Sequence, residues 1–156
     1  MIVRLSVIFI YPNSQKLFNF VTNSNYIAKD KYHHLVKKAL QKAGWLITND
    51  PFYIPTLKRK LEVDLGAERI VAAEKDNVKI AVEIKSFIGL SEIHEFYKAL
   101  GQFNYYQLAL EDHQPERILY LAVPSDIYDT LFTEPLTLKA IERYNIEEEN
   151  IEKWIN

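Results

Sequence analysis

The sequence predicts an α/β fold in which a central mixed β-sheet is flanked by helices. Apolar residues recur at helical spacing in residues 30–44 and 92–112, and short strand-like runs lie between these two segments. Residues 118–123 form a continuous apolar run of the kind found in strands that are covered on both faces. The expected order is therefore helix, several strands, helix, strand and then further helices.

Residues 30–44 are expected to form the first helix. Asp30 can cap its start, and Gly44 stands where a left-handed C-cap is favoured. Residues 45–48 then have the pattern of a short strand, and Asn49, Asp50 and Pro51 that of a turn.

Residues 69–75 and 78–86 are expected to form a tight hairpin around Asp76 and Asn77. In that register Glu74 faces Lys79, and we expect the two to form a cross-strand charge pair. Glu83 would lie roughly 13 Å from Glu74 at the usual rise per residue, too far to share a metal ion.

Residues 92–112 are expected to form a long helix with Ser91 as its N-cap. The spacing places Ile93, Phe96, Tyr97, Leu100 and Phe103 on one side. Because this helix joins the hairpin to residues 118–123, we expect a right-handed crossover. Short helices are expected at 125–132 and 135–144, and a last edge strand at 151–155.

Composition indicates one globular, soluble domain. The chain has 156 residues, of which 48% are hydrophobic and 26% charged. We assign residues 27–156 to a single domain and residues 1–26 to an N-terminal extension or extra strand. The early apolar run is too short to span a membrane, and no cleavage site follows it.

The chain contains no cysteine, which excludes disulfides, thiolate zinc sites and thiol nucleophiles and suits the cytoplasm. Its formal net charge is −2. A binding mode that depends on an extended basic surface is therefore not expected, and any contact with DNA must come from local patches.

One strand carries a pair of charged residues that needs an explanation. In residues 79–85, alternation places Glu83 and Lys85 on one face and the apolar Ile80, Val82 and Ile84 on the other. The explanation is either structural, as a charged edge that protects against aggregation or as ordinary pairing with neighbouring charges, or catalytic. In catalysis, a carboxylate holds Mg²⁺ while a lysine positions the attacking water.

Asp64 strengthens the catalytic interpretation, because it lies in an otherwise apolar segment where burial is costly without a partner or a metal. A turn aspartate beside Gly66 is the alternative. Asp64 and Glu83 together would make a hard oxygen site suited to Mg²⁺ or Mn²⁺. Glu62 alternates onto the same face as Asp64 and could orient the metal ligands without binding the metal itself.

Lys58, Arg59 and Lys60 form a short basic run that could touch DNA phosphates. A solvated hairpin tip is the more common role for so short a run. His33 on the first helix is most simply a core or capping histidine.

Residues 30–154 resemble the XisH family, the fdxN-element excision controlling factors, which belong to the restriction-endonuclease-like PD-(D/E)XK fold. The resemblance is carried by short motifs spread over the chain: Tyr32-His33, Val36-Lys37, Gly44-Trp45, Val63-Asp64-Leu65-Gly66, Ala72-Ala73-Glu74-Lys75, Val82-Glu83-Ile84-Lys85-Ser86-Phe87, Leu100-Gly101-Gln102 and Leu121-Ala122-Val123-Pro124. The usual proline before the aspartate is replaced by Val63.

The resemblance implies a restriction-endonuclease-like core of order α-β-β-β-α-β. It implies metal binding by Asp64, Glu83 and the Ile84 carbonyl, and a catalytic role for Lys85. By similarity to a Gln-x-x-x-Tyr helix in related nucleases, Gln102 is a candidate for phosphate or water contact. A surface glutamine with satisfied hydrogen bonds is the equal alternative.

Two functions stay open at this point. One is a Mg²⁺-dependent endodeoxyribonuclease of the PD-(D/E)XK type. The other is a catalytically silent, DNA-binding or protein-binding accessory that assists a site-specific recombinase together with an XisI-type partner. A nuclease in defence or in a toxin pair is a weaker third. Many relatives of this fold act as homodimers, so self-association is also expected.

Overall fold

The computed structural model describes residues 6–10, 25–55, 60–61 and 70–143. Its main sheet has five strands in the order β1-β7-β6-β5-β2. In chain order these strands are β1 (Ser6–Ile10), β2 (Leu46–Asn49), β5 (Ile70–Lys75), β6 (Val78–Ile84) and β7 (Arg117–Pro124). The first three strands in sheet order run parallel, and β5 and β2 are antiparallel to their neighbours. The expected mixed sheet with flanking helices is confirmed.

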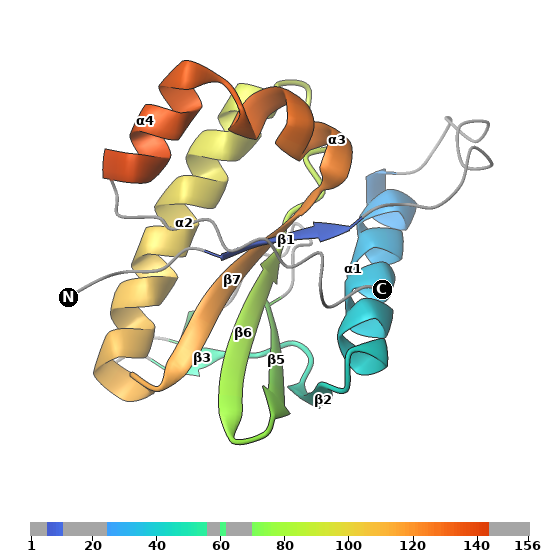
Figure 1. Cartoon of the computed structure of the whole chain (residues 1–156), viewed down its shortest axis with the longest axis vertical. Coiled ribbons are helices and arrows are strands. Elements are labelled where there is room, and N and C mark those ends of the chain that lie inside the picture. Colours follow the sequence, from blue (N-terminus) through green and yellow to red (C-terminus); the bar gives the residue numbers. More distant parts are fainter. Residues whose placement is uncertain (1–5, 11–24, 56–59, 62–69, 144–156) are drawn as a thin grey trace.

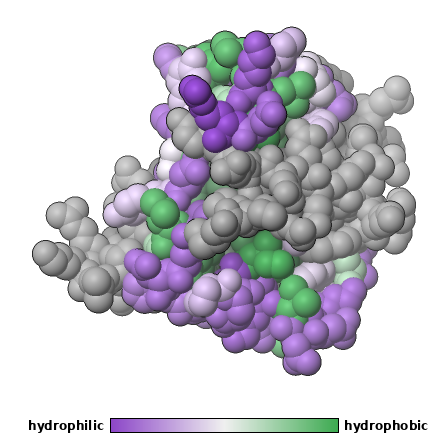
Figure 2. All heavy atoms as spheres, turned by 60° about the vertical axis from the view of Figure 1, so that its left-hand side comes forward, coloured by the Kyte–Doolittle hydropathy of each residue, from purple (hydrophilic) through white to green (hydrophobic). Residues whose placement is uncertain are grey.

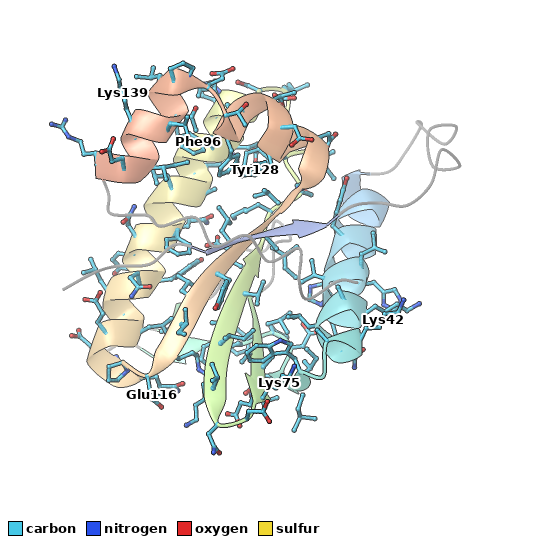
Figure 3. The ribbon with its side chains drawn as sticks, viewed as in Figure 1. Lys42, Lys75, Phe96, Glu116, Tyr128 and Lys139 are labelled. Carbon is cyan, nitrogen blue, oxygen red and sulfur yellow. The ribbon has the colours of Figure 1, made fainter. Side chains whose placement is uncertain are left out.

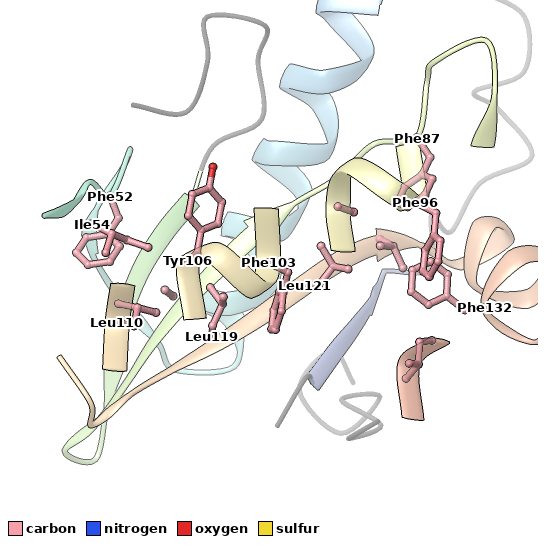
Figure 4. Packing of buried hydrophobic residues seen from close by; sticks show 14 of the residues in the cluster. Phe52, Ile54, Phe87, Phe96, Phe103, Tyr106, Leu110, Leu119, Leu121 and Phe132 are labelled. Atoms are coloured by element: carbon pink, nitrogen blue, oxygen red, sulfur yellow. The ribbon is translucent and has the colours of Figure 1, made fainter. Parts of the chain in front are cut away.

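Helices cover both faces of this sheet (Figure 1). Helix α1 (Asn25–Lys42) packs Val36 and Leu40 against one face, where Val82 and Ile84 of β6 are buried. Helix α2 (Glu92–His113) packs Phe96, Phe103 and Leu110 against the other face, which includes Leu119 and Leu121 of β7 (Figure 4). Strand β7 contributes to both clusters, as its continuous apolar sequence predicted.

Helix α1 ends where the sequence indicated. Gly44 has φ +86°, a left-handed conformation that glycine adopts without steric cost. The Lys75 ammonium donates to the carbonyl oxygen of Ala43 at 2.6 Å and so caps the helix end (Figure 3). The helix begins at Asn25 rather than at Asp30, so the assumed N-cap residue lies inside it.

The β5–β6 hairpin is confirmed. Asp76 and Asn77 have φ values of 49° and 65°, as a two-residue turn of the primed type requires. Glu74 and Lys79 are register partners. Their side chains nevertheless form ion pairs with other residues. Glu74 lies 3.7 Å from Arg117, and Lys79 lies 3.2 Å from Glu116. The expected Glu74–Lys79 pair is therefore wrong, because β7 and its preceding turn offer closer opposite charges.

Helix α2 connects β6 to β7, which are parallel. Ser91 caps its first turn by accepting a hydrogen bond from the backbone N–H of His94 at 3.5 Å. Phe96 and Phe103 are buried as predicted, but Ile93 and Tyr97 are 36% and 59% exposed. Ala99 and Tyr106 are buried instead, so the buried face is rotated relative to the one predicted.

The remaining described elements are short. Strands β3 (Ile54–Pro55) and β4 (Lys60–Leu61) form a separate two-stranded sheet that the sequence did not predict. After β7 come α3 (Ser125–Ile127), the π-helix η1 (Tyr128–Phe132) and α4 (Pro135–Arg143). The expected strand at 151–155 lies outside the described residues. None of the described helices combines the length and hydropathy that a membrane span requires.

Candidate functional site

The charged pair singled out in the sequence lies at the end of β6. Glu83 and Lys85 alternate with Val82 and Ile84, whose side chains are buried on the α1 side of the sheet. The pair therefore faces α2. Glu83 is 2% exposed and Lys85 5% exposed. The backbone N–H of Lys85 donates to the carbonyl of Ala122 at 2.9 Å and fixes this end of β6 against β7.

Gln102 joins the pair from helix α2. The Lys85 ammonium lies 3.1 Å from Oε1 of Glu83 and donates to Oε1 of Gln102 at 2.6 Å. Three polar groups from two elements thus meet in a buried place. Because an ammonium group has three protons to donate, the glutamine satisfies a second one beyond the carboxylate.

Burial gives this group its chemical character. Removing two charges from water is costly unless they pair closely and their remaining hydrogen-bonding capacity is satisfied. Glu83 and Lys85 neutralise each other, and Gln102 holds the ammonium in a defined orientation. A fixed, desolvated ammonium beside a carboxylate can bind an anionic oxygen and orient a water molecule.

A divalent metal needs more oxygen ligands than this group supplies. Glu83 is its only carboxylate, and no cluster of three or more His, Cys, Asp or Glu side chains suited to a metal occurs among the described residues. Asp64 and Glu62 lie outside the described ranges. The described part of the site alone therefore does not fit Mg²⁺, and the expected metal site depends on Asp64.

The basic run is described only in part. Lys58 and Arg59 lie outside the described residues, whereas Lys60 belongs to β4 and pairs with Pro55 of β3. The two ends of the segment are thus joined as a hairpin, although contact with DNA stays an expectation.

A second polar cluster, on the α1 side of the sheet, was not predicted as a unit. His33 Nε2 and Lys37 Nζ from α1 both contact Oδ2 of Asp50, at 2.9 and 2.5 Å. His33 and Lys37 are one helical turn apart, and this spacing was the available signal. Asp50 was interpreted only as a turn residue. Since α1 and α2 cover opposite faces, this cluster is separate from Glu83 and Lys85.

Two crystal structures resemble the chain over most of its length. An XisH family protein from Nostoc punctiforme PCC 73102 is 42% identical, with a TM-score of 0.68, covering 80% of this chain and 94% of that one. A protein from Anabaena variabilis, described as an fdxN element excision controlling factor, is 40% identical with a TM-score of 0.69. That match covers 81% of this chain and 95% of the other. No curated protein matches.

The family model for the XisH protein matches residues 26–149. This match includes α1 apart from its first residue, every strand of the main sheet except β1, and the residues Glu83, Lys85 and Gln102. The chain belongs to the XisH family.

Proposed function

We propose that this chain acts on DNA as a Mg²⁺-dependent phosphodiesterase of the PD-(D/E)XK type, on a restriction-endonuclease-like core. The observation that carries the proposal is the buried group formed by Glu83, Lys85 and Gln102. Removing an ion pair from water costs free energy, so a functional role is one explanation for keeping such a pair. Electrostatic stabilisation of a phosphate in a desolvated site is such a role.

The biological setting comes from the Anabaena variabilis relative, which is described as an fdxN element excision controlling factor. We propose that this chain likewise takes part in excision of a DNA element. DNA is then its substrate or its binding partner.

The roles of the residues follow from their contacts. Lys85 holds an anionic phosphate oxygen or the attacking water, and Gln102 keeps the ammonium in place. Glu83 pairs with that ammonium at 3.1 Å and offsets its charge. Asp64, Glu83 and the Ile84 carbonyl are the proposed metal ligands. Bound Mg²⁺ would supply Lewis-acid stabilisation of the phosphodiester.

The decisive experiment is DNA cleavage with and without Mg²⁺, using duplex, single-stranded and branched substrates. Glu83→Gln and Lys85→Met should each abolish cleavage while circular dichroism shows a folded protein. Glu74→Gln and Lys79→Met are matched controls, because they remove the same charges at the other end of the hairpin. Absence of metal-dependent cleavage, or cleavage that survives Glu83→Gln, contradicts the proposal.

A second function is favoured by a specific observation: Lys85 is already engaged by Glu83 and Gln102 inside the chain, as in a purely structural pair. The chain would then be a catalytically silent accessory of a site-specific recombinase, working with an XisI-type partner. Excision in cells that carry only the Lys85→Met variant would support this function. Loss of excision with a folded Lys85→Met protein would support catalysis.

A further inference from the structure

Helix α2 carries a stripe of apolar residues on the side that faces away from the sheet. Tyr97 and Tyr105 are each 59% exposed, Leu108 is 61% exposed and Ile93 is 36% exposed. Together with Gly101 they follow one line along the helix, because they are spaced by three or four residues. We call Ile93, Tyr97, Gly101, Tyr105 and Leu108 the α2 stripe.

None of these side chains belongs to either core cluster, although the ring of Tyr97 lies 6.4 Å from that of the buried Phe96. The buried face of α2 consists of Phe96, Ala99, Phe103, Tyr106, Ala109 and Leu110, which lie against the sheet. At Gly101 an added Cβ would meet no atom within 4 Å, so the backbone itself is open at the middle of the stripe. On the face that Figure 2 shows, the described residues are mainly hydrophilic, with scattered hydrophobic groups between them.

The size of the stripe suits a protein contact. Tyrosine side chains at this exposure leave on the order of 100 Å² each in water, so the whole stripe leaves several hundred Å². Monomeric proteins rarely expose larger continuous apolar patches than this. A stable interface usually buries about 800 Å² per partner, so the stripe supplies the apolar centre of such an interface and the polar residues around it supply the rest.

The order of residues in the stripe is nearly symmetric about Gly101. Tyr97 lies four residues before Gly101 and Tyr105 lies four residues after it; Ile93 and Leu108 lie at similar distances further out. An antiparallel copy that crosses at Gly101 therefore brings Tyr97 beside the other copy's Tyr105, and Ile93 beside its Leu108. A two-fold interface requires this kind of self-complementarity. The glycine lets the two backbones approach closely at the crossing point.

Charges around the stripe agree with this arrangement. Lys98, three residues before Gly101, is paired with Glu95 of its own helix at 3.3 Å. The exposed His94 comes level with Leu108 of the second copy, about one turn from the exposed Asp112 of that copy. Among the described residues of α2, no like charges meet at the centre of this arrangement.

We propose that the α2 stripe is the interface of an antiparallel homodimer, whose occupant is a second copy of this chain. The inference is independent of phosphodiester cleavage. It requires only that two copies meet along α2, with Gly101 next to the two-fold axis.

Oligomeric state tests it first. Sedimentation equilibrium from low to high micromolar concentration should show a dimer for the natural chain and a folded monomer for Tyr97→Glu with Tyr105→Glu. Leu136→Glu is the matched control, since Leu136 is an apolar residue of α4 that is 76% exposed and lies off the stripe. A natural chain that is monomeric throughout, or a dimer that survives the double substitution, overturns the proposal.

Cross-linking tests the geometry, and the chain has no cysteine to interfere. Under mild oxidation Gly101→Cys should form a disulfide-linked dimer much faster than Lys139→Cys, which Figure 3 places on the outside of α4. In an equal mixture of Tyr97→Cys and Tyr105→Cys, random pairing gives as much mixed dimer as the two self-linked dimers together, and the antiparallel arrangement should give clearly more. Equal rates for Gly101→Cys and Lys139→Cys, or a mixed dimer no more abundant than the two self-linked dimers together, contradict the antiparallel arrangement.

Discussion

The ring nitrogen Nε2 of His33, in α1, lies 2.9 Å from Oδ2 of Asp50, which directly follows β2. Lys37 contacts the same oxygen. This contact ties helix α1 to the strand that it leads into. Asp50→Asn should lower the free energy of unfolding by about 1–3 kcal/mol at neutral pH, because it removes charge-assisted hydrogen bonds. Urea titration measures the loss, with the exposed Asp129→Asn as control.

The same contact predicts a pH dependence. Burial alone would raise the pKa of the Asp50 carboxyl, but hydrogen bonds from Lys37 and His33 outweigh it and hold that pKa below its usual value. A lowered folded-state pKa stabilises the fold above about pH 4, the unfolded value, and this stabilisation is lost as the pH falls further. The stability difference between the natural chain and Asp50→Asn should therefore shrink below pH 4. A difference that is constant between pH 3 and pH 7 would show that the carboxylate charge contributes nothing.

The buried Glu83–Lys85 pair predicts strong energetic coupling. Lys85→Met leaves the Glu83 carboxylate buried without its cation, which should cost about 3–5 kcal/mol. Adding Glu83→Gln removes that charge. The double variant should therefore lose less unfolding free energy than the sum of the losses in the two single variants. The cycle, measured by denaturant unfolding, should give a coupling of about 1–3 kcal/mol. Strictly additive losses would mean that the two side chains do not interact.

Phe87, two residues after Lys85, combines backbone strain with good packing. Its φ is 54°, in the left-handed region that a bulky residue avoids, and its ring packs edge-on against Phe132 with centroids 6.0 Å apart. Phe87→Ala should cost about 3–5 kcal/mol because it removes a buried ring. Phe87→Gly loses the same ring but relieves the strain, so it should be about 1 kcal/mol more stable than the alanine variant. Thermal unfolding of both variants checks the order, and a more stable alanine variant would falsify the role of strain.

The hairpin turn offers a simpler test of backbone conformation. Asn77 has φ 65°, which asparagine and glycine tolerate far better than β-branched residues do. Asn77→Gly should leave stability unchanged or slightly higher, whereas Asn77→Val should lower it by about 1–2 kcal/mol. The comparison needs only the midpoints of chemical unfolding. Equal midpoints for the two variants would contradict a left-handed turn.

Much of the fold could be predicted because its signals are local. Gly44, Ser91 and the Asp76-Asn77 turn mark the ends of elements through their own backbone preferences, and the structure confirms all three. Alternation also placed Glu83 and Lys85 on one face of β6. Such signals depend on the neighbouring residues along the chain, which a sequence displays directly.

The predictions that were wrong or missing concern contacts that depend on tertiary structure. Periodicity alone does not say which of two apolar lines along α2 faces the sheet, so Ile93 and Tyr97 were assigned to the core in place of Ala99 and Tyr106. Glu74 and Lys79 face each other as predicted, yet each pairs with a charge next to β7. Asp50 contacts His33 across 17 positions of sequence, and no local pattern encodes that distance.

Strand β1 pairs in parallel with β7 and forms one edge of the sheet, while the match to the XisH family begins only at residue 26. The strand that precedes the family region is thus joined to the sheet through the backbone hydrogen bonds between β1 and β7. In a protein truncated to the family region, the backbone N–H and C=O groups on the β1 side of β7 would lose their hydrogen-bond partners. That edge of β7 could accept a β-strand from any other chain, so the truncated protein should aggregate more readily than the natural one.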